Sequence, residues 1–163
     1  MEPRQKPGRS KQDYGTPPEF LAAVKARLGI DQFDWDLAAT YDNAVAPSFF
    51  SAFDNALEQP WPMAGWNWLN PPYASIGPWV EKARREARDR DVRTVVLIPA
   101  AVGSNWWRDY VHMRCRVVFL NPRLTFVGCK DPYPKDCALL LYAHGYRGYE
   151  VWTWKTARAK KVA

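Results

Sequence analysis

Apolar residues recur along the chain at two spacings, one typical of helices and one typical of strands. Four of them repeat every three or four positions, the spacing of a helix that buries one face: Phe20, Leu21, Val24 and Leu28. The preceding residues, Thr-Pro-Pro-Glu, predict Thr16 as the N-cap, a proline in the first turn and Glu19 as the end of a capping box. Gly29 is the expected end of this helix.

A second amphipathic pattern and a series of short apolar runs follow. Residues 78–89 predict a helix with charged side chains (Arg, Lys and Glu) outward and four residues inward: Trp79, Val80, Ala83 and Ala87. Apolar runs predict strands at 33–37, 66–69, 94–98, 116–120, 124–127, 137–142 and 149–154. A short link containing Gly145 and Gly148 predicts that the last two form an antiparallel hairpin. Residues 41–62 show no sustained period and are expected to be irregular.

This order of elements predicts the fold class and the position of a site. Helices that alternate with apolar strands indicate an α/β fold, with helices packed on a mostly parallel, twisted sheet. A chain of 163 residues is long enough for one such domain, which we place at 13–154 between a disordered basic tail, 1–12, and a basic C-terminal tail, 155–163. Ligands of such sheets bind beyond the carboxyl ends of the strands.

Charge is distributed unevenly along this chain. The net charge is +6, but residues 13–72 carry −6 while residues 73–154 carry +5, and the tails add +3 and +4. Basic tails attract nucleic acid through the release of counterions from phosphates. They are also found simply as solvated ends, and the sequence leaves both interpretations open.

Cysteines, histidines and hydropathy exclude other classes of protein. Cys115, Cys129 and Cys137 are odd in number and form no CxxC pair, which predicts reduced thiols in a cytoplasmic protein. His112 and His144 are not spaced with them as zinc ligands, so no metal site is expected. The chain has no signal peptide and no apolar run near 18 residues, so no membrane partner is expected either.

The most distinctive segment is Asn70-Pro71-Pro72-Tyr73, between a predicted strand and a predicted helix. An exocyclic amine of a nucleobase, such as N6 of adenine, is flat and poorly nucleophilic. Two acceptors aimed at its two N–H bonds stabilise the charge that develops as it attacks a methyl donor. The side-chain oxygen of Asn70 and the carbonyl of Pro71 are suited to this, because Pro72 fixes the conformation of Pro71. Tyr73 offers a flat face to an extruded base.

The same four residues also make a rigid strand-to-helix connection, a purely structural alternative. Other segments decide between the two. NPPY after an apolar strand resembles the catalytic motif of amino-methyltransferases that use S-adenosylmethionine. In chain order, Tyr14-Gly-Thr-Pro-Pro, FDWDLAAT at 33–40, NPPYASIGPWVEKA from Asn70 and VVLIPA from Val95 resemble the small Dam-like DNA N6-adenine methyltransferases of phages. The resemblance covers about residues 13–142 and implies a Rossmann-like class I methyltransferase domain.

The resemblance implies a role for each matching residue. Asn70, Pro71, Pro72 and Tyr73 would hold the target amine and base. The S-adenosylmethionine site would be formed by Tyr14, Thr16, Pro17, Asp36, Ala38 and Ala39, with Asp54 as acceptor for the adenine amine of the cofactor. DNA would be contacted by Trp106, Arg123 and Phe126. Separately from the resemblance, the positive charge of the second half of the chain predicts that phosphates lie near its arginines: Arg84, Arg85, Arg88, Arg108, Arg114, Arg116 and Arg123. A phage or prophage gene would supply the enzyme to the cytoplasm of a bacterial host, for restriction-modification or regulation.

The chain departs from the family pattern around the cofactor. It lacks the glycine-rich FxGxG loop, and the Ala-Ala of DLAAT stands in its place. Asp42 is a candidate for the ribose hydroxyls, although an aspartate in a turn explains it equally well. Asp34 and Asp36 also fit solvent-facing positions of an edge strand.

Three other functions stay open. NPPY also occurs in enzymes that methylate a glutamine side chain in proteins, although the TPPE segment argues against that substrate. A module of the same fold that binds nucleic acid without binding a donor is the second. A small α/β protein with a proline turn is the third, and the order of several motifs argues against it.

Overall fold

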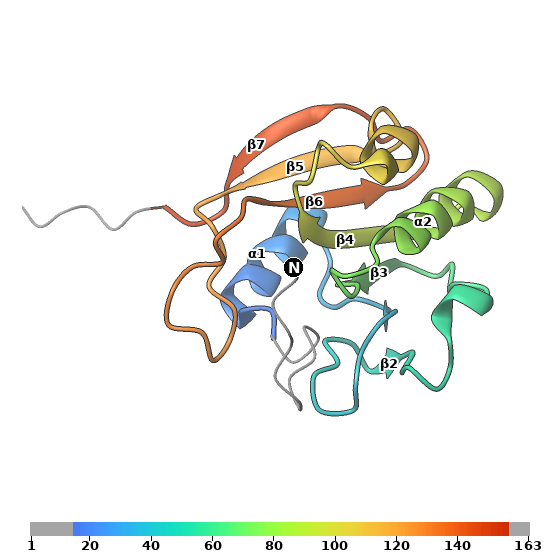
Figure 1. Ribbon diagram of the computed structural model, residues 1–163. Helices are drawn as coiled ribbons and strands as arrows, with labels where there is room; N and C mark the ends of the chain where they lie inside the picture. The colour runs from blue at the N-terminus through green and yellow to red at the C-terminus, as the bar shows by residue number, and fades with distance from the viewer. Residues whose placement is uncertain (1–14, 157–163) are drawn as a thin grey trace, which may run out of the picture.

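Six of the seven apolar runs form strands of one sheet in the computed structural model, which describes residues 15–156 (Figure 1). The strands are β1 (Trp35–Asp36), β2 (Ser48–Phe49), β3 (Trp66–Leu69), β4 (Arg93–Pro99), β5 (Arg116–Asn121), β6 (Cys137–Tyr142) and β7 (Tyr149–Thr153). The helices are α1 (Pro18–Leu28), α2 (Gly77–Arg90), the 3₁₀ turn η2 (Ala56–Glu58) and the π-helical turn η3 (Trp107–Val111). Tyr14 and most of the two expected tails lie outside the described residues.

The sheet is mixed, with the strand order β2-β1-β3-β4-β6-β5-β7. β6 is antiparallel to both of its neighbours, β4 and β5, and every other pairing is parallel. All the strands except β6 therefore point the same way, and their carboxyl ends meet at one edge of the sheet. We call this the carboxyl edge, and the opposite one the amino edge. The α/β class is confirmed.

The two long helices cover opposite faces of this sheet (Figure 1). Residues of β4 alternate between the faces, as the pleat of a strand requires: Val96 and Ile98 pack with α2, while Val95 and Leu97 pack with α1. The central strands are buried on both faces, which is why β4 and β6 read as continuous apolar runs.

The predicted C-terminal hairpin is wrong. β6 and β7 are not neighbours, because β5 lies between them and pairs with both: Val117 is opposite Leu140 on one side and Tyr149 on the other. A β6–β7 hairpin would leave one side of an apolar strand unpaired. The link between them instead carries β7 across to the outer side of β5.

Two local predictions are also wrong. Residues 124–127 form no strand; they belong to the loop from 122 to 136, in which the Tyr133 amide donates to the Leu124 carbonyl at 2.7 Å. Helix α1 begins one residue later than expected, with Pro17 as its N-cap and no side-chain cap, so Thr16 and Glu19 form no capping box. Gly29 ends α1 with φ of 67°, as predicted.

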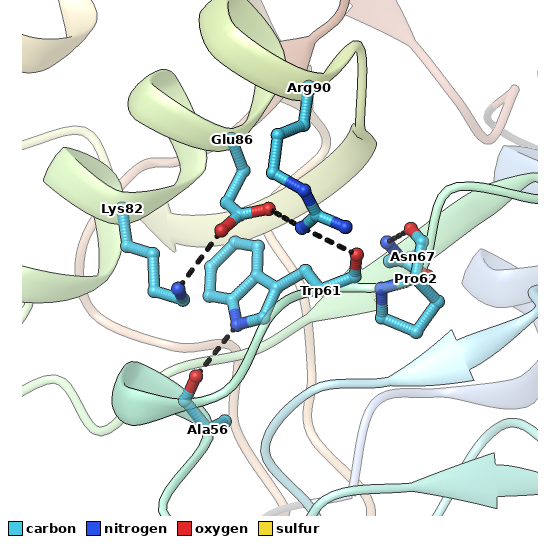
Figure 2. A network of polar contacts seen from close by, with 7 residues as sticks. All are labelled: Ala56, Trp61, Pro62, Asn67, Lys82, Glu86 and Arg90. Carbon is cyan, nitrogen blue, oxygen red and sulfur yellow. Dashed lines mark hydrogen bonds and ion pairs between the residues drawn. The ribbon is translucent and has the colours of Figure 1, made fainter.

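A buried polar network holds the irregular segment before β3 against α2 (Figure 2). Lys82 and Glu86, expected to face outward, are each 6% exposed and form an ion pair at 3.1 Å. Glu86 also pairs with Arg90, and Arg90 donates to the Trp61 carbonyl at 3.1 Å. The Trp61 indole N–H in turn donates to the Ala56 carbonyl at 2.9 Å, and the Lys82 ammonium lies 5.3 Å from the centre of the Trp61 ring. Each charged side chain of this network has a partner.

Candidate active site

Two neighbouring strands bring the cofactor-like and catalytic-like segments together at the carboxyl edge. Asp36, the last residue of β1, is paired with Trp68 of β3, and Asn70 follows the end of β3. Thr16, Asp36, Ala38 and Asn70 line one narrow cavity of about 30 Å³. Three of the predicted cofactor residues and one predicted amine residue therefore line the same cavity, although Asn70 follows Thr16 by 54 positions in the chain and Asp36 by 34.

Asp36 is buried and fixes the loop that follows β1. It is 3% exposed, so it does not occupy a solvent-facing position. Its carboxylate accepts hydrogen bonds from the Ala38 amide at 3.3 Å and the Val45 amide at 3.1 Å. Burial raises the pKa of Asp36 to about 6, although these two hydrogen bonds favour the ionised form. A buried carboxyl of this kind in a cavity is a functional-site candidate.

The alanines of DLAAT make a tight loop without glycine. None of residues 36–40 has a positive φ, so the loop requires no glycine backbone. The Ala39 amide donates to the Phe50 carbonyl at 2.9 Å, and the Leu37 amide to the Trp68 carbonyl at 2.9 Å. This loop therefore forms without the glycine-rich FxGxG segment. Ala38 lines the cavity, whereas Ala39 is buried behind it.

Asn70 presents an enclosed and unsatisfied acceptor. Its side-chain oxygen is buried and has no hydrogen-bond partner within residues 15–156. Two other unsatisfied atoms, Asn67 Oδ1 and Thr94 Oγ1, belong to residues paired across β3 and β4 nearer the amino edge. An unsatisfied buried amide oxygen costs roughly 1–3 kcal/mol, so the Asn70 acceptor is held where a hydrogen-bond donor would stabilise it.

Tyr73 belongs to an aromatic cluster beside this acceptor. Its ring is half-buried, and its hydroxyl is enclosed without a hydrogen-bond partner among the residues described. Burial holds the pKa of Tyr73 well above its usual value, so the phenol stays protonated. Tyr133 meets Tyr73 with ring centres 6.1 Å apart, and Phe126 meets Tyr133 edge-to-face at 5.5 Å. Phe126, predicted to pack on the base, is therefore joined to Tyr73 through Tyr133.

The loop that carries these two aromatics also supports the start of the chain described here. The Val127 amide donates to the Gly15 carbonyl at 2.9 Å, and Gly15 and Thr16 line the cavity. In Figure 1 this loop, the orange segment after β5, lies beside α1. Pro17 is buried and its carbonyl accepts from the Phe20 and Leu21 amides; it lies next to the cavity wall without lining it.

Several predicted residues lie away from the cavity. Asp54 is exposed and closes a local turn, accepting from the Ser51 amide at 2.7 Å and the Ser51 hydroxyl at 3.0 Å. Asp42 is exposed in the turn after DLAAT. Trp106 packs on Trp107, with ring centres 6.0 Å apart, and lies beside Gly77 at the start of α2, the helix that follows NPPY. Arg123 is on the surface, in an ion pair with Asp136.

Sequence reasoning missed five residues of the site, the first of them Gly15, which lines the cavity beside Thr16. Asn43, Val45 and Trp68 line the cavity, and Tyr133 completes the aromatic cluster. The sequence pattern around Trp68 predicts only a buried strand residue, and Trp68 is indeed buried as well as lining the cavity. Asn43 and Tyr133 lie in loops whose course has no periodic signal. Within residues 15–156, no group of three or more His, Cys, Asp or Glu is placed to hold a metal ion, and no helix is long and apolar enough to cross a membrane.

The chain matches a known protein family over most of its length. The model of the family DNA N-6-adenine-methyltransferase (Dam) matches residues 5–147 of the chain. The chain belongs to this family. It is also 30% identical, over 112 residues, to the DNA N-6-adenine-methyltransferase of Escherichia phage T1. That match covers 69% of this chain but 46% of the phage protein, so the chain spans about half the length of this curated relative.

Proposed function

We propose that this chain transfers a methyl group from S-adenosylmethionine to N6 of adenine in DNA, on a Rossmann-like class I methyltransferase domain. One observation carries the proposal. The side-chain oxygen of Asn70 is enclosed and unsatisfied in the described structure, in the same cavity as Thr16 and Asp36. Membership of the Dam family and the name of the phage T1 relative support the choice of adenine in DNA.

Two acceptors of this kind would activate the amine without a general base. Asn70 accepts one N–H of the target amine and the Pro71 carbonyl accepts the other. As the nitrogen becomes tetrahedral it gains positive charge, and both acceptors then stabilise it more strongly than they stabilise the flat amine. The Tyr73 ring, supported by Tyr133, provides the face on which an extruded adenine stacks.

The other residues of this cavity fit a cationic methyl donor. When bound, S-adenosylmethionine supplies the electrophilic methyl group. Thr16, Ala38 and Asp36 would hold it, since the small Ala38 permits close approach and a buried carboxylate favours a nearby cation. A cavity of about 30 Å³ is too narrow for this donor. Binding therefore requires the walls formed by Gly15–Thr16 and by Asn43–Val45 to move apart.

The position of the site in the sheet supports the assigned domain type. β1, β3 and β4 are parallel neighbours, and the cofactor-like and amine-like segments follow the first two of them. We place the reaction in the cytoplasm of a bacterial host, as the phage relative suggests.

The experiment is to incubate the full chain with labelled S-adenosylmethionine and unmethylated DNA and to analyse the digested nucleosides by mass spectrometry. The expected product is N6-methyladenine, absent when Asn70→Ala replaces the wild type. Donor binding without any methylated nucleoside would redirect the assignment to a protein amide. DNA binding without donor binding would identify an inactive binding module.

A further inference from the structure

The arginines expected to contact phosphates are divided between the two edges of the sheet. Arg114 and Arg116 lie where β5 begins, at the amino edge. The Arg116 guanidinium donates to the Arg147 carbonyl, and the Arg147 guanidinium donates to the Arg114 carbonyl. Arg88 lies near the end of α2, which leads to the start of β4 at the same edge. Arg123 follows the end of β5, and so lies at the carboxyl edge with NPPY.

Arg123 lines an open groove of about 800 Å³ at the carboxyl edge. One wall is the first part of the 122–136 loop, and the other is the chain that leaves β7, Thr153–Thr156, with Glu19 of α1 beside it. Because β5 and β7 are parallel, both of these segments emerge at the edge that also holds Asn70.

The groove presents cations, hydroxyls and one aromatic ring. The side chains of Arg123 and Lys155 are 48% and 55% exposed, in ion pairs with Asp136 and Glu19. The Lys155 ammonium also lies 6.0 Å from the centre of the Trp154 ring. Thr125 and Thr153 are exposed hydroxyl donors on opposite walls. Surface ion pairs contribute little to stability, so both cations can exchange their carboxylate for a phosphate at small cost.

The loop with residues 122–136 separates this groove from the active site and contacts both. Thr125 and Pro132 face the groove, while their neighbours Phe126 and Tyr133 turn to the other side, toward Tyr73. A strand that lay in the groove would therefore be separated from the base-stacking ring by the thickness of one loop.

We propose that this groove binds the sugar-phosphate backbone of the DNA strand next to the target adenine, with Arg123 and Lys155 as its phosphate contacts. Glu19 competes with phosphate for Lys155. The identity of the bound strand rests on the proposed function; the groove as a phosphate site does not.

The test measures the binding of a labelled oligonucleotide to the full chain over a series of salt concentrations. The logarithm of the affinity falls linearly with the logarithm of the salt concentration, and each lost phosphate contact makes this negative slope shallower by about one. We expect Arg123→Gln and Lys155→Gln each to produce this change, and Glu19→Gln to tighten binding. The matched variant is Arg93→Gln, which removes an exposed arginine that also lies over a tryptophan ring, that of Trp66, but at the amino edge where β4 begins. It should leave the slope unchanged.

An unchanged slope in both groove variants would overturn the proposal, as would an equal change in Arg93→Gln. Thermal unfolding of each variant shows whether a loss of binding reflects a loss of structure. Methyl transfer is scored separately. If the wild type forms no N6-methyladenine but the slopes change as stated, the proposed function fails and the groove assignment stands.

Discussion

Two buried polar clusters of this protein differ in whether their polar atoms find partners. In the closed cluster, Trp61, Lys82, Glu86 and Arg90 have their charges and the indole N–H paired within the cluster or with the backbone (Figure 2). The open cluster consists of Asp36, Asn70 and Tyr73. The Asn70 oxygen and the Tyr73 hydroxyl have no hydrogen-bond partner in the described structure, and burial raises the pKa of Asp36.

Under the proposed function, this difference separates groups that stabilise the fold from groups that bind a ligand. A cluster that is complete by itself gains nothing from a further partner. An enclosed acceptor without a donor carries a free-energy cost, which a bound amine would remove. Mutations in the closed cluster should therefore lower the free energy of unfolding, and mutations in the open cluster should lower the rate of methyl transfer.

The largest effect on stability is expected from Glu86→Ala. This change leaves Lys82 buried without its anion, and removing one partner of a buried ion pair costs about 3–5 kcal/mol in the free energy of unfolding. Glu81→Ala, at an exposed position of the same helix, is the control and should change stability by less than about 0.5 kcal/mol. Denaturant unfolding measures both; equal effects would show that the network is not a stabilising unit.

Asn70→Ala should lower the rate of methyl transfer by about 10²- to 10³-fold, the usual loss when one preorganised polar contact to the transition state is removed. Its stability should hardly fall, because the Asn70 oxygen has no partner to lose. Asn67→Ala is the counterpart on β3: the Asn67 amide donates to the Pro62 carbonyl at 2.9 Å, so its loss should reduce stability and spare the rate in the folded fraction.

Asp36 should make stability and donor binding depend on pH in opposite directions. Its pKa is about 6 in the folded protein against 3.8 ordinarily, so the folded state binds the extra proton between these values. The contribution of Asp36 to the free energy of unfolding is largest below about pH 4 and falls by about 3 kcal/mol in total as the pH rises to 6. Donor affinity should rise over the same range, because the carboxylate forms.

Calorimetric titration with S-adenosylmethionine between about pH 4 and 7 checks the second effect, and unfolding at the same pH values checks the first. Asp36→Asn should remove both dependences. A pH-independent affinity in the wild type would exclude Asp36 from the donor site.

The smallest effect is expected from Tyr73→Phe. Removing a hydroxyl that has no partner should raise the free energy of unfolding by about 1 kcal/mol and leave methyl transfer within a few-fold, because the ring remains. Tyr142→Phe is the matched control: the Tyr142 hydroxyl donates to the Tyr110 carbonyl at 2.7 Å, so this variant should lose stability. A destabilised Tyr73→Phe would show that its hydroxyl does have a partner.

The sequence identified the open cluster better than the closed one. Asn70, Asp36, Thr16 and Ala38 were predicted because motifs mark them, and the strand pairing of β1 with β3 brings them together. Lys82 and Glu86 were misassigned to a solvent-facing side, because helical spacing gives the angle of a side chain but not which loop packs over it. The order of β5, β6 and β7 was missed for a related reason: a short link does not reveal whether another strand inserts between its ends.

The most direct test of the account is the single-turnover rate of methyl transfer to an adenine-containing oligonucleotide, compared between wild type, Asn70→Ala and Asn67→Ala under conditions where all three are folded. The account predicts that Asn70→Ala alone loses about two orders of magnitude or more. If Asn70→Ala transferred methyl groups at the wild-type rate, or if Asn67→Ala lost as much, the unsatisfied Asn70 oxygen would not be the acceptor that activates the amine.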